Sequence, residues 1–217
     1  HWGVSLFRHR TDFLALSSQG LYYLVLALST MSTSLEQIIA SVRKRVEAAK
    51  AALPLNEIAK QAYSFARPIR RFRRALESAP DGIAVIAELK KGSPSRGVIR
   101  EDFPVTALAR RLEESGAAAL SVVTEEDHFL GSLENLAAAS AATRLPCLRK
   151  DFIIDEYQLY QARLHSADAV LLIAAVLNPA KFQALYIRAS ELQLEVLCEI
   201  HDESEMEMVA EFGVDIV

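Results

Sequence analysis

The strongest constraint on the fold of this chain is an alternation of two residue patterns between Ile83 and Val217. Short apolar, β-rich runs are each followed by a polar turn and then by a stretch with apolar residues at helical spacing. The apolar runs occupy residues 83–89, 118–124, 146–150, 169–175, 194–200 and 214–217. The helical stretches occupy residues 105–116, 133–142, 157–166, 180–193 and 203–213. Because nearly continuous apolar strands have no polar face, the pattern predicts an α/β fold in which helices cover a parallel sheet.

Two kinds of parallel sheet fit this pattern: an open doubly wound sheet and a (β/α)8 TIM barrel. An open dinucleotide-binding sheet would carry a GxGxxG turn after its first strand, whereas this chain has the turn KKGSPSRG at residues 90–97. We therefore predict the barrel. A complete barrel has eight strands in about 250 residues. The six visible runs thus predict a barrel truncated here after about strand 6, with roughly two more strand-helix units expected beyond Val217.

Three segments are expected along the chain. Residues 81–217 form the partial barrel, and residues 31–80 form an N-terminal helical extension whose capping boxes, at Thr33 or Ser34, are typical of a helix start. Residues 1–30 place basic side chains before an apolar run, which resembles a secretory leader. That run is too short to span a membrane. We interpret residues 1–30 as a non-native or leader-like extension.

Composition and charge exclude several classes of protein. The chain is 51% hydrophobic and 24% charged, as in globular proteins rather than disordered segments. Its formal net charge of -4 provides no overall attraction for nucleic acid. We expect a cytoplasmic protein with no nucleic-acid and no membrane partner. Cys147 and Cys198 lie apart inside apolar runs without CxxC spacing, which predicts two buried thiols rather than a disulfide or a metal site.

A local basic cluster is the exception to this charge balance. It comprises Arg67, Arg70, Arg71, Arg73 and Arg74. The cluster could bind anions or nucleic acid, or it could be a helix face balanced by acidic neighbours. The lack of interleaved aromatic residues beyond Phe72 favours the second interpretation.

Ionisable residues gather where the predicted strands end, and barrel enzymes place their active sites at that end. Only the fourth run is apolar at its exit. The residues at the other exits are Glu88, Lys90, Thr124, Glu125, Glu126, Lys150, Asp151, Glu199, His201 and Asp202. Glu88 and Lys90 are two residues apart, so on a strand they face the same side, and a carboxylate beside an ammonium suits proton transfer.

Several of these polar residues have a structural interpretation that we favour. Asp151 is expected to cap the turn that follows it, and Asp202 is expected to be the N-cap of a helix. His128 and His165 have no cysteine, histidine or carboxylate partner at the spacing of metal ligands, so we predict no metal site.

Four segments of the sequence resemble the indole-3-glycerol phosphate synthase family of tryptophan biosynthesis. They are AVIAELKKGSPSRGVI, LSVVTEEDHFLGSLENL, PCLRKDFIIDEYQLYQARLHSADAVLLI and LEVLCEIHDESE. The resemblance covers residues 31–217 and implies a cytosolic carboxy-lyase. Such an enzyme closes the indole ring of 1-(2-carboxyphenylamino)-1-deoxyribulose 5-phosphate, releasing carbon dioxide and water, without a cofactor or metal. It also leaves open fusion to, or association with, other enzymes of the pathway.

The resemblance assigns roles to residues in these motifs. It implies that Lys150 is the general acid, that Glu199 and Glu88 are catalytic carboxylates, and that Lys90 meets the substrate's carboxylate or phosphate and serves as a second acid. Ser93, Phe129 and Phe152 are the implied substrate-binding residues, the two rings enclosing the anthranilate ring. The alternatives are another phosphate-binding TIM-barrel enzyme, such as a sugar-phosphate isomerase, and a noncatalytic truncated fragment.

Overall fold

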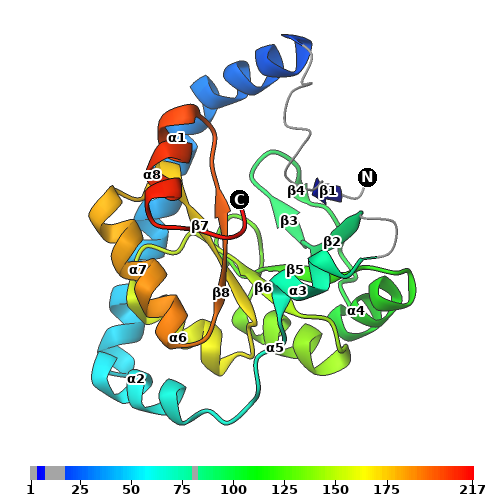
Figure 1. The fold of residues 1–217 in the computed structure, drawn as a ribbon, viewed down its shortest axis with the longest axis vertical. Helices are drawn as coiled ribbons and strands as arrows, with labels where there is room; N and C mark the ends of the chain where they lie inside the picture. Colours follow the sequence, from blue (N-terminus) through cyan, green and yellow to red (C-terminus); the bar gives the residue numbers. More distant parts are fainter. Residues whose placement is uncertain (1–3, 8–17, 80–82) are drawn as a thin grey trace.

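The main sheet of the protein consists of five parallel strands and one antiparallel edge strand. The computed structural model describes residues 4–7, 18–79 and 83–217, and side chains from Leu35 onward. The sheet order is β1-β2-β5-β6-β7-β8 (Figure 1). The strands span Val4–Phe7, Ala84–Leu89, Ala119–Val123, Cys147–Lys150, Ala169–Ile173 and Glu195–Glu199. The parallel pairing from β2 to β8 confirms the predicted α/β fold and five of its six strands.

The two ends of this sheet differ from the prediction. The expected strand at residues 214–217 is present only as an isolated parallel bridge between Leu197 and Ile216. At the other edge, β1 pairs antiparallel with β2, and no strand was predicted from the sequence in residues 1–30. Apart from β1 and the start of the first helix, the leader-like pattern of residues 1–30 lies outside the described residues.

The five predicted helices that follow the strands are all present, and four of them begin after a residue whose side chain caps the helix. They are α4 (Val105–Glu114), α5 (Leu133–Ala142), α6 (Glu156–Leu164), α7 (Pro179–Glu191) and α8 (Glu203–Glu211). Ser132, Asp155, Asn178 and Asp202 accept a hydrogen bond from a backbone N–H of the helix that each precedes. The N-cap role expected for Asp202 is thereby confirmed, and the same contacts satisfy N–H groups that have no intrahelical partner.

Three helices precede the parallel strands: α1 (Ser18–Ala52), α2 (Leu55–Ser64) and α3 (Phe72–Glu77). The predicted helix start at Thr33 or Ser34 is wrong, because α1 begins upstream at Ser18. No proline interrupts residues 18–52, so the helix can propagate through the capping-box sequence. None of the helices in the described part of the chain has the length and apolar character that a membrane crossing needs.

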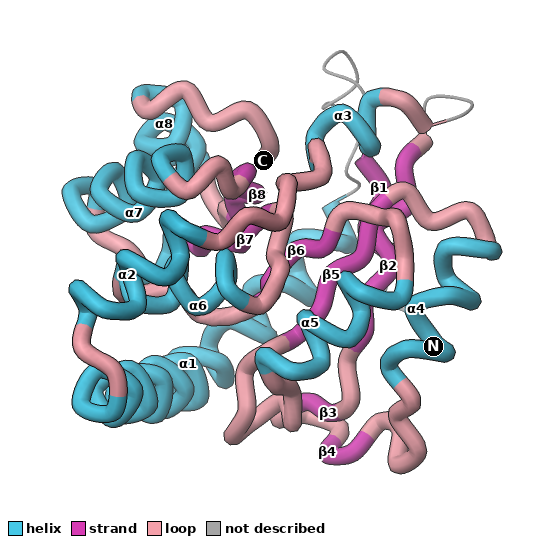
Figure 2. Tube along the Cα trace, turned by 90° about the horizontal axis from the view of Figure 1, so that it is seen from below, coloured by secondary structure: helices cyan, strands magenta, loops and turns pink. Residues whose placement is uncertain are grey.

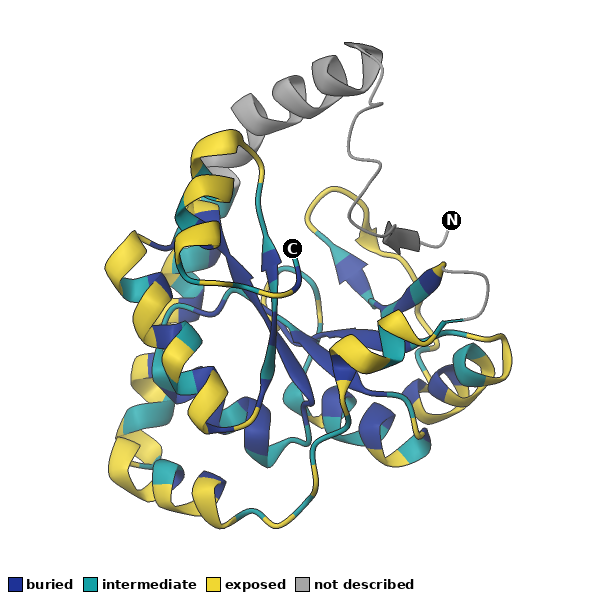
Figure 3. Ribbon diagram, viewed as in Figure 1, coloured by how far each residue is buried: buried dark blue, intermediate teal, exposed yellow. Residues whose placement is uncertain are grey.

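The parallel sheet separates two apolar layers. Its outer face packs against the helices, through residues such as Leu89, Leu120 and Leu172, and Figure 2 shows these helices arranged around the strands. The opposite, inner face carries a smaller cluster of Phe72, Ile86, Ala119, Leu148, Ala169 and Ile216, with Leu76 and Leu197 packed against it. Figure 3 shows that the strands are largely buried while the outward helix faces are exposed. Helix α3 therefore covers the inner layer with the fully buried ring of Phe72.

The basic cluster before β2 is largely engaged in contacts within the protein. Arg67 forms an ion pair of 3.0 Å with the fully buried Asp168. Arg70 donates to the carbonyl oxygens of Leu145 and Ser140. Arg73 pairs with two carboxylates, those of Glu77 and Asp215. These contacts support the interpretation of the cluster as a balanced structural segment.

Candidate active site

The inner face of the sheet brings three of the predicted catalytic residues into direct contact. The carboxylate of Glu88 accepts a hydrogen bond of 2.6 Å from Lys90 Nζ at Oε1 and one of 2.7 Å from Lys150 Nζ at Oε2. Glu88 lies two residues after Ile86, and Lys150 lies two residues after Leu148, both of which belong to the inner apolar layer. Because side chains alternate along a strand, Glu88 and Lys150 lie on this same inner face.

The environment of Glu88 favours its ionised form. Burial disfavours the charged carboxylate, but the ammonium groups of Lys150 and Lys90, by charge and by hydrogen bonding, overcome this effect and hold the pKa of Glu88 below its ordinary value. The Glu88 side chain is only 13% exposed, while those of Lys90 and Lys150 are 32% and 41% exposed. The site thus consists of a shielded anion beneath two cations that remain accessible to a ligand.

Glu199 lies on the same face but does not join this cluster. It ends β8, two residues after Leu197 of the inner layer. Its Oε1 lies 3.4 Å from Nε2 of His201. Within the described residues, no hydrogen bond or ion pair connects Glu199 to Lys150 or Glu88. The structure therefore places Glu199 on the expected face, two strands away from Lys150 in the sheet order β6-β7-β8.

The two predicted aromatic residues are neighbours, but their rings do not form an open slot. The ring centroids of Phe129 and Phe152 are 6.1 Å apart, and the ring planes are inclined at 45°. Enclosing a third ring needs two stacking contacts of about 3.5 Å each, or about 7 Å in total, between parallel faces. An aryl group would therefore bind between these rings only after one of them turned, or would bind along the edge of the pair.

Ser93 lies in a small hairpin beside these rings. Strands β3 (Gly92–Ser93) and β4 (Gly97–Val98) form the hairpin, and the Ser93 hydroxyl lies 3.4 Å from that of Ser95. The N–H of Gly92 donates to the carbonyl of Phe129 at 3.1 Å, which fixes the hairpin against the loop after β5. A Cβ atom at Gly92 would lie 2.9 Å from the Gly97 carbonyl oxygen, so this close approach requires glycine.

Other charged residues at the strand exits have structural roles that the sequence did not reveal. Asp151 confirms its expected capping role by accepting the N–H of Phe152, but it also pairs with Arg149 at 2.8 Å. The side chains of this pair are each 4% exposed, and Thr124 donates to the same carboxylate. The alternation of faces is the signal that could have identified this pair, because Arg149 and Asp151 flank the inward-facing Lys150.

Glu125 is likewise a structural residue and does not join the cluster of Glu88, Lys90 and Lys150. Its carboxylate accepts the N–H groups of Asp127, His128 and Phe129, and it lies 2.9 Å from Arg45 of α1. It therefore fixes the loop that carries Phe129.

The prediction that His128 has no carboxylate partner at the spacing of metal ligands is wrong. His128 does have carboxylate neighbours, since Glu125, Asp127 and His128 place potential ligand atoms within 4.8 Å of one another. Arg45, however, contacts both carboxylates, at 2.9 Å and 2.6 Å. A protein cation, Arg45, thus already occupies the space between these two carboxylates and offsets part of their charge.

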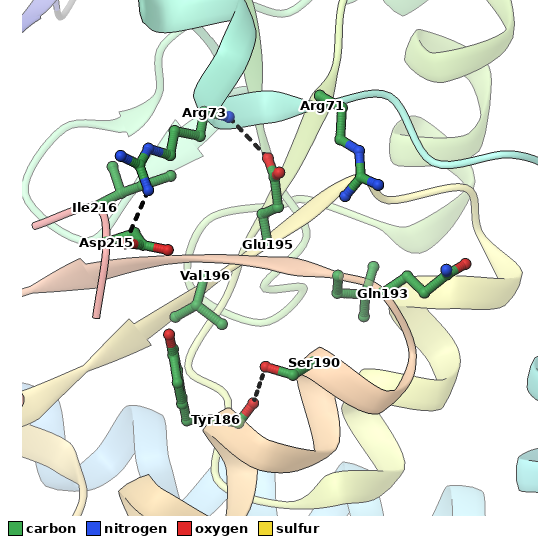
Figure 4. Close-up of a pocket in the computed structure, with 10 residues that line it drawn as sticks. Arg71, Arg73, Tyr186, Ser190, Gln193, Glu195, Val196, Asp215 and Ile216 are labelled. Carbon is green, nitrogen blue, oxygen red and sulfur yellow. Dashed lines mark hydrogen bonds and ion pairs between the residues drawn. The ribbon is translucent and has the colours of Figure 1, made fainter. Parts of the chain in front are cut away.

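A hollow in the surface lies far from this site along β8. Its volume is about 190 Å³, and its lining includes Arg71, Arg73, Glu195 and Asp215 (Figure 4). Arg73 donates its backbone N–H to Glu195, the first residue of β8. The hollow therefore lies at the opposite end of the strand from Glu199, and it is not the predicted active site.

Comparisons with known proteins identify the family of the chain. The family model described as "Indole-3-glycerol phosphate synthase" matches residues 35–217. A protein of that description from Koribacter versatilis is 50% identical over 188 residues, which is 86% of this chain and 72% of that relative. Those from Chlorobium luteolum and Chromobacterium violaceum are 46% and 47% identical over 185 and 190 residues. These matches cover 85% and 86% of this chain and 70% and 71% of the respective relatives. The chain belongs to the indole-3-glycerol phosphate synthase family of tryptophan biosynthesis, whose activity is that of a carboxy-lyase.

Proposed function

We propose that the cluster of Glu88, Lys90 and Lys150 is the centre at which this chain closes the indole ring. The observation that carries the proposal is the position of Lys150: its ammonium lies 2.7 Å from the shielded Glu88 carboxylate, yet its side chain is 41% exposed. A cation that is held in place and still accessible can donate a proton to a substrate oxygen. The substrate is 1-(2-carboxyphenylamino)-1-deoxyribulose 5-phosphate.

The proposed reaction begins with proton transfer from Lys150. The ring carbon that bears the carboxylate attacks the keto carbon of the substrate, while Lys150 protonates the keto oxygen. Carbon dioxide then leaves, which restores the aromatic ring. Glu199 and Glu88 assist the later loss of a proton and of water, giving indole-3-glycerol phosphate. Each such general acid or base contributes typically about 10²- to 10⁴-fold to the rate.

The remaining residues hold the substrate in the proposed complex. Lys90 contacts the substrate's carboxylate or phosphate and serves as a second acid, since its ammonium shares the Glu88 carboxylate with Lys150. Phe129 and Phe152 contact the aryl ring, and Ser93 binds from the adjacent hairpin. The apolar exit of β7 extends the wall of this site through Leu171 and Ile173, both buried. No metal or organic cofactor takes part in this proposal.

We also propose that the five parallel strands are part of the wall of a (β/α)8 barrel preceded by a helical extension at residues 31–80. The inner apolar layer supports this, because a barrel interior is filled with side chains contributed by several strands. We further propose a cytoplasmic location, as expected for an enzyme of amino-acid biosynthesis. Association with other enzymes of the pathway remains a prediction.

The decisive assay follows formation of indole-3-glycerol phosphate when the purified protein is mixed with the carboxyphenylamino substrate. We expect turnover of this substrate and none in a coupled assay for ketose isomerisation. Isomerisation without indole formation would favour the sugar-phosphate isomerase. A cooperative thermal transition that a substrate analogue does not shift, together with no turnover, would favour the noncatalytic fragment.

A further inference from the structure

Ser121 carries a buried hydroxyl group that has no hydrogen-bond partner. The residue is 5% exposed, and its Oγ is one of two buried side-chain polar atoms without a partner among the described residues. The other is Nη1 of Arg163, whose Nη2 still donates to two backbone carbonyls. Leaving a buried hydroxyl unpaired reduces the stability of the fold. A buried hydroxyl without a partner is available to form a hydrogen bond in another state of the protein.

The position of Ser121 identifies that partner. Ser121 is paired in register with Glu88 on the adjacent parallel strand. It lies two residues after Ala119 of the inner apolar layer, so its side chain is on the same face of the sheet as that of Glu88. Neighbouring strands are about 4.8 Å apart, so the side chains of these paired residues are adjacent on one face, although Ser121 Oγ makes no hydrogen bond to Glu88 in the structure.

Glu88 needs another donor during the proposed reaction. In the structure each of its two oxygens accepts one hydrogen bond, Oε1 from Lys90 and Oε2 from Lys150. When Lys150 turns toward the substrate oxygen, the Oε2 atom loses its donor while the carboxylate remains largely buried. A buried charge that loses a hydrogen bond is strongly destabilised. A neutral hydrogen-bond donor close to Glu88 would reduce the free-energy cost of losing the bond from Lys150.

We propose that Ser121 is a positioning residue that donates its hydroxyl proton in a hydrogen bond to Glu88 Oε2 when Lys150 leaves that oxygen to act on the substrate. The inference deepens the proposed function and rests on it. In the structure Ser121 Oγ makes no hydrogen bond to Glu88, so the exchange requires rotation of the Ser121 or Glu88 side chain about its own torsion angles, without movement of the backbone. No proton is transferred: Ser121 keeps its hydroxyl proton, and Lys150 remains the donor to the substrate.

The charges around Glu88 determine how this hydrogen bond can be detected. Lys150 on β6, and Lys90 just after the strand that carries Glu88, lower the pKa of the Glu88 carboxyl. Ser121 on β5 contributes no charge, and Glu199 on β8 lies on the same inner face, two residues after Leu197. A change at Ser121 therefore acts on Glu88 only through the hydroxyl, and most clearly where Lys150 has been removed.

The test measures the pKa of Glu88 by carbon-13 NMR of glutamate side chains in four proteins. These are the unmodified protein, Ser121→Ala, Lys150→Met and the double variant. With Lys150 present, Ser121→Ala should leave the pKa of Glu88 unchanged. With Lys150 replaced, loss of the hydroxyl should raise it clearly, because a donor to the carboxylate favours the ionised form. An equal pKa in Lys150→Met and in the double variant would overturn the proposal.

Turnover measures the effect of Ser121 independently, in variants that retain Lys150. Ser121→Ala should lower kcat about tenfold, the effect of losing one hydrogen bond to a charged group, and leave KM unchanged. Ser121→Cys retains the size of the side chain but donates weakly, so it should behave like Ser121→Ala, and it replaces that variant if the alanine protein does not fold. An unchanged kcat in a folded variant would also refute the role.

Ser140→Ala is the matched control. Ser140 is 1% exposed and its hydroxyl is already used, accepting a hydrogen bond of 2.9 Å from Arg67. This variant should lower the melting temperature without changing kcat or the pKa of Glu88. If the unmodified protein does not turn over the substrate at all, the proposed function fails, whereas the NMR comparison still decides the role of Ser121.

Discussion

The buried pair of Arg149 and Asp151 provides a demanding test of how the strand that carries Lys150 is held. The side chains are each 4% exposed, and the shortest contact between them is 2.8 Å. Arg149 also donates to the Gln158 carbonyl at 2.6 Å, and Asp151 accepts from Thr124 at 2.7 Å. Replacing Asp151 by alanine leaves a buried guanidinium without its counter-ion.

The expected loss of stability for Asp151→Ala is about 3–5 kcal/mol, the range for breaking one partner of a buried ion pair. At roughly 2–4 °C per kcal/mol for a chain of this size, the melting temperature should fall by about 6–20 °C. Urea unfolding followed by circular dichroism gives the free energy directly. Because Lys150 and Phe152 adjoin Asp151, the surviving folded protein should also lose activity.

The control for this experiment is an exposed ion pair in the same chain. Arg73 and Glu77 approach to 2.7 Å, but their side chains are 47% and 48% exposed. Glu77→Ala should therefore lower the free energy of unfolding far less than Asp151→Ala does, because solvent screens an exposed ion pair. If Asp151→Ala and Glu77→Ala lower the free energy of unfolding by the same amount, the buried pair does not hold the strand as described.

Three further predictions follow from individual residues. The pKa of Glu88 is lower in the folded protein than its ordinary value of 4.5, so ionised Glu88 stabilises the fold above pH 4.5, and this stabilisation is lost as the pH falls through the lower folded pKa. The free energy of unfolding of the unmodified protein, measured in urea, should therefore lose its advantage over that of Glu88→Gln below pH 4.5. A constant difference between the two proteins would contradict this. Gly131→Ala should destabilise the protein by more than about 2 kcal/mol, because the new Cβ would lie 2.3 Å from the Val123 carbonyl oxygen; an unchanged melting temperature would show that the loop can move. Burial raises the pKa of the Cys147 thiol to about 12, so a thiol reagent at neutral pH should modify it only after unfolding, and rapid labelling of the folded protein would refute its burial.

The sequence allowed the parallel sheet to be predicted because strands buried on both faces are apolar throughout. The runs at residues 118–124 and 169–175 were recognisable for this reason, and β5 and β7 are buried along their whole length. The edge strand β1 was missed because an antiparallel edge does not need such a run. At the other edge, residues 214–217 had the expected composition, but only Ile216 forms a bridge.

The cluster of site residues was predicted less completely, because the position of a residue at a strand exit does not specify its face. Glu88 and Lys150 were both predicted to lie at the strand exits that form the active site, and their side chains are hydrogen-bonded to each other. Glu125 was counted with them at the strand exits and Asp151 was expected to cap a turn, but both are buried and anchor a loop and a strand. Sequence could not reveal Arg45 as the partner of Glu125, because the two residues are brought together only by the docking of α1.

The most direct test of the account measures turnover by Lys150→Ala. The Lys150 side chain is 41% exposed and contacts Glu88, so its loss should affect chemistry far more than folding. We expect kcat to fall by at least about 10²-fold, with a cooperative unfolding transition retained. The control Lys60→Ala, on an exposed position of α2, should leave kcat unchanged. Near-normal turnover by folded Lys150→Ala would contradict the role of Lys150 as the acid that closes the ring.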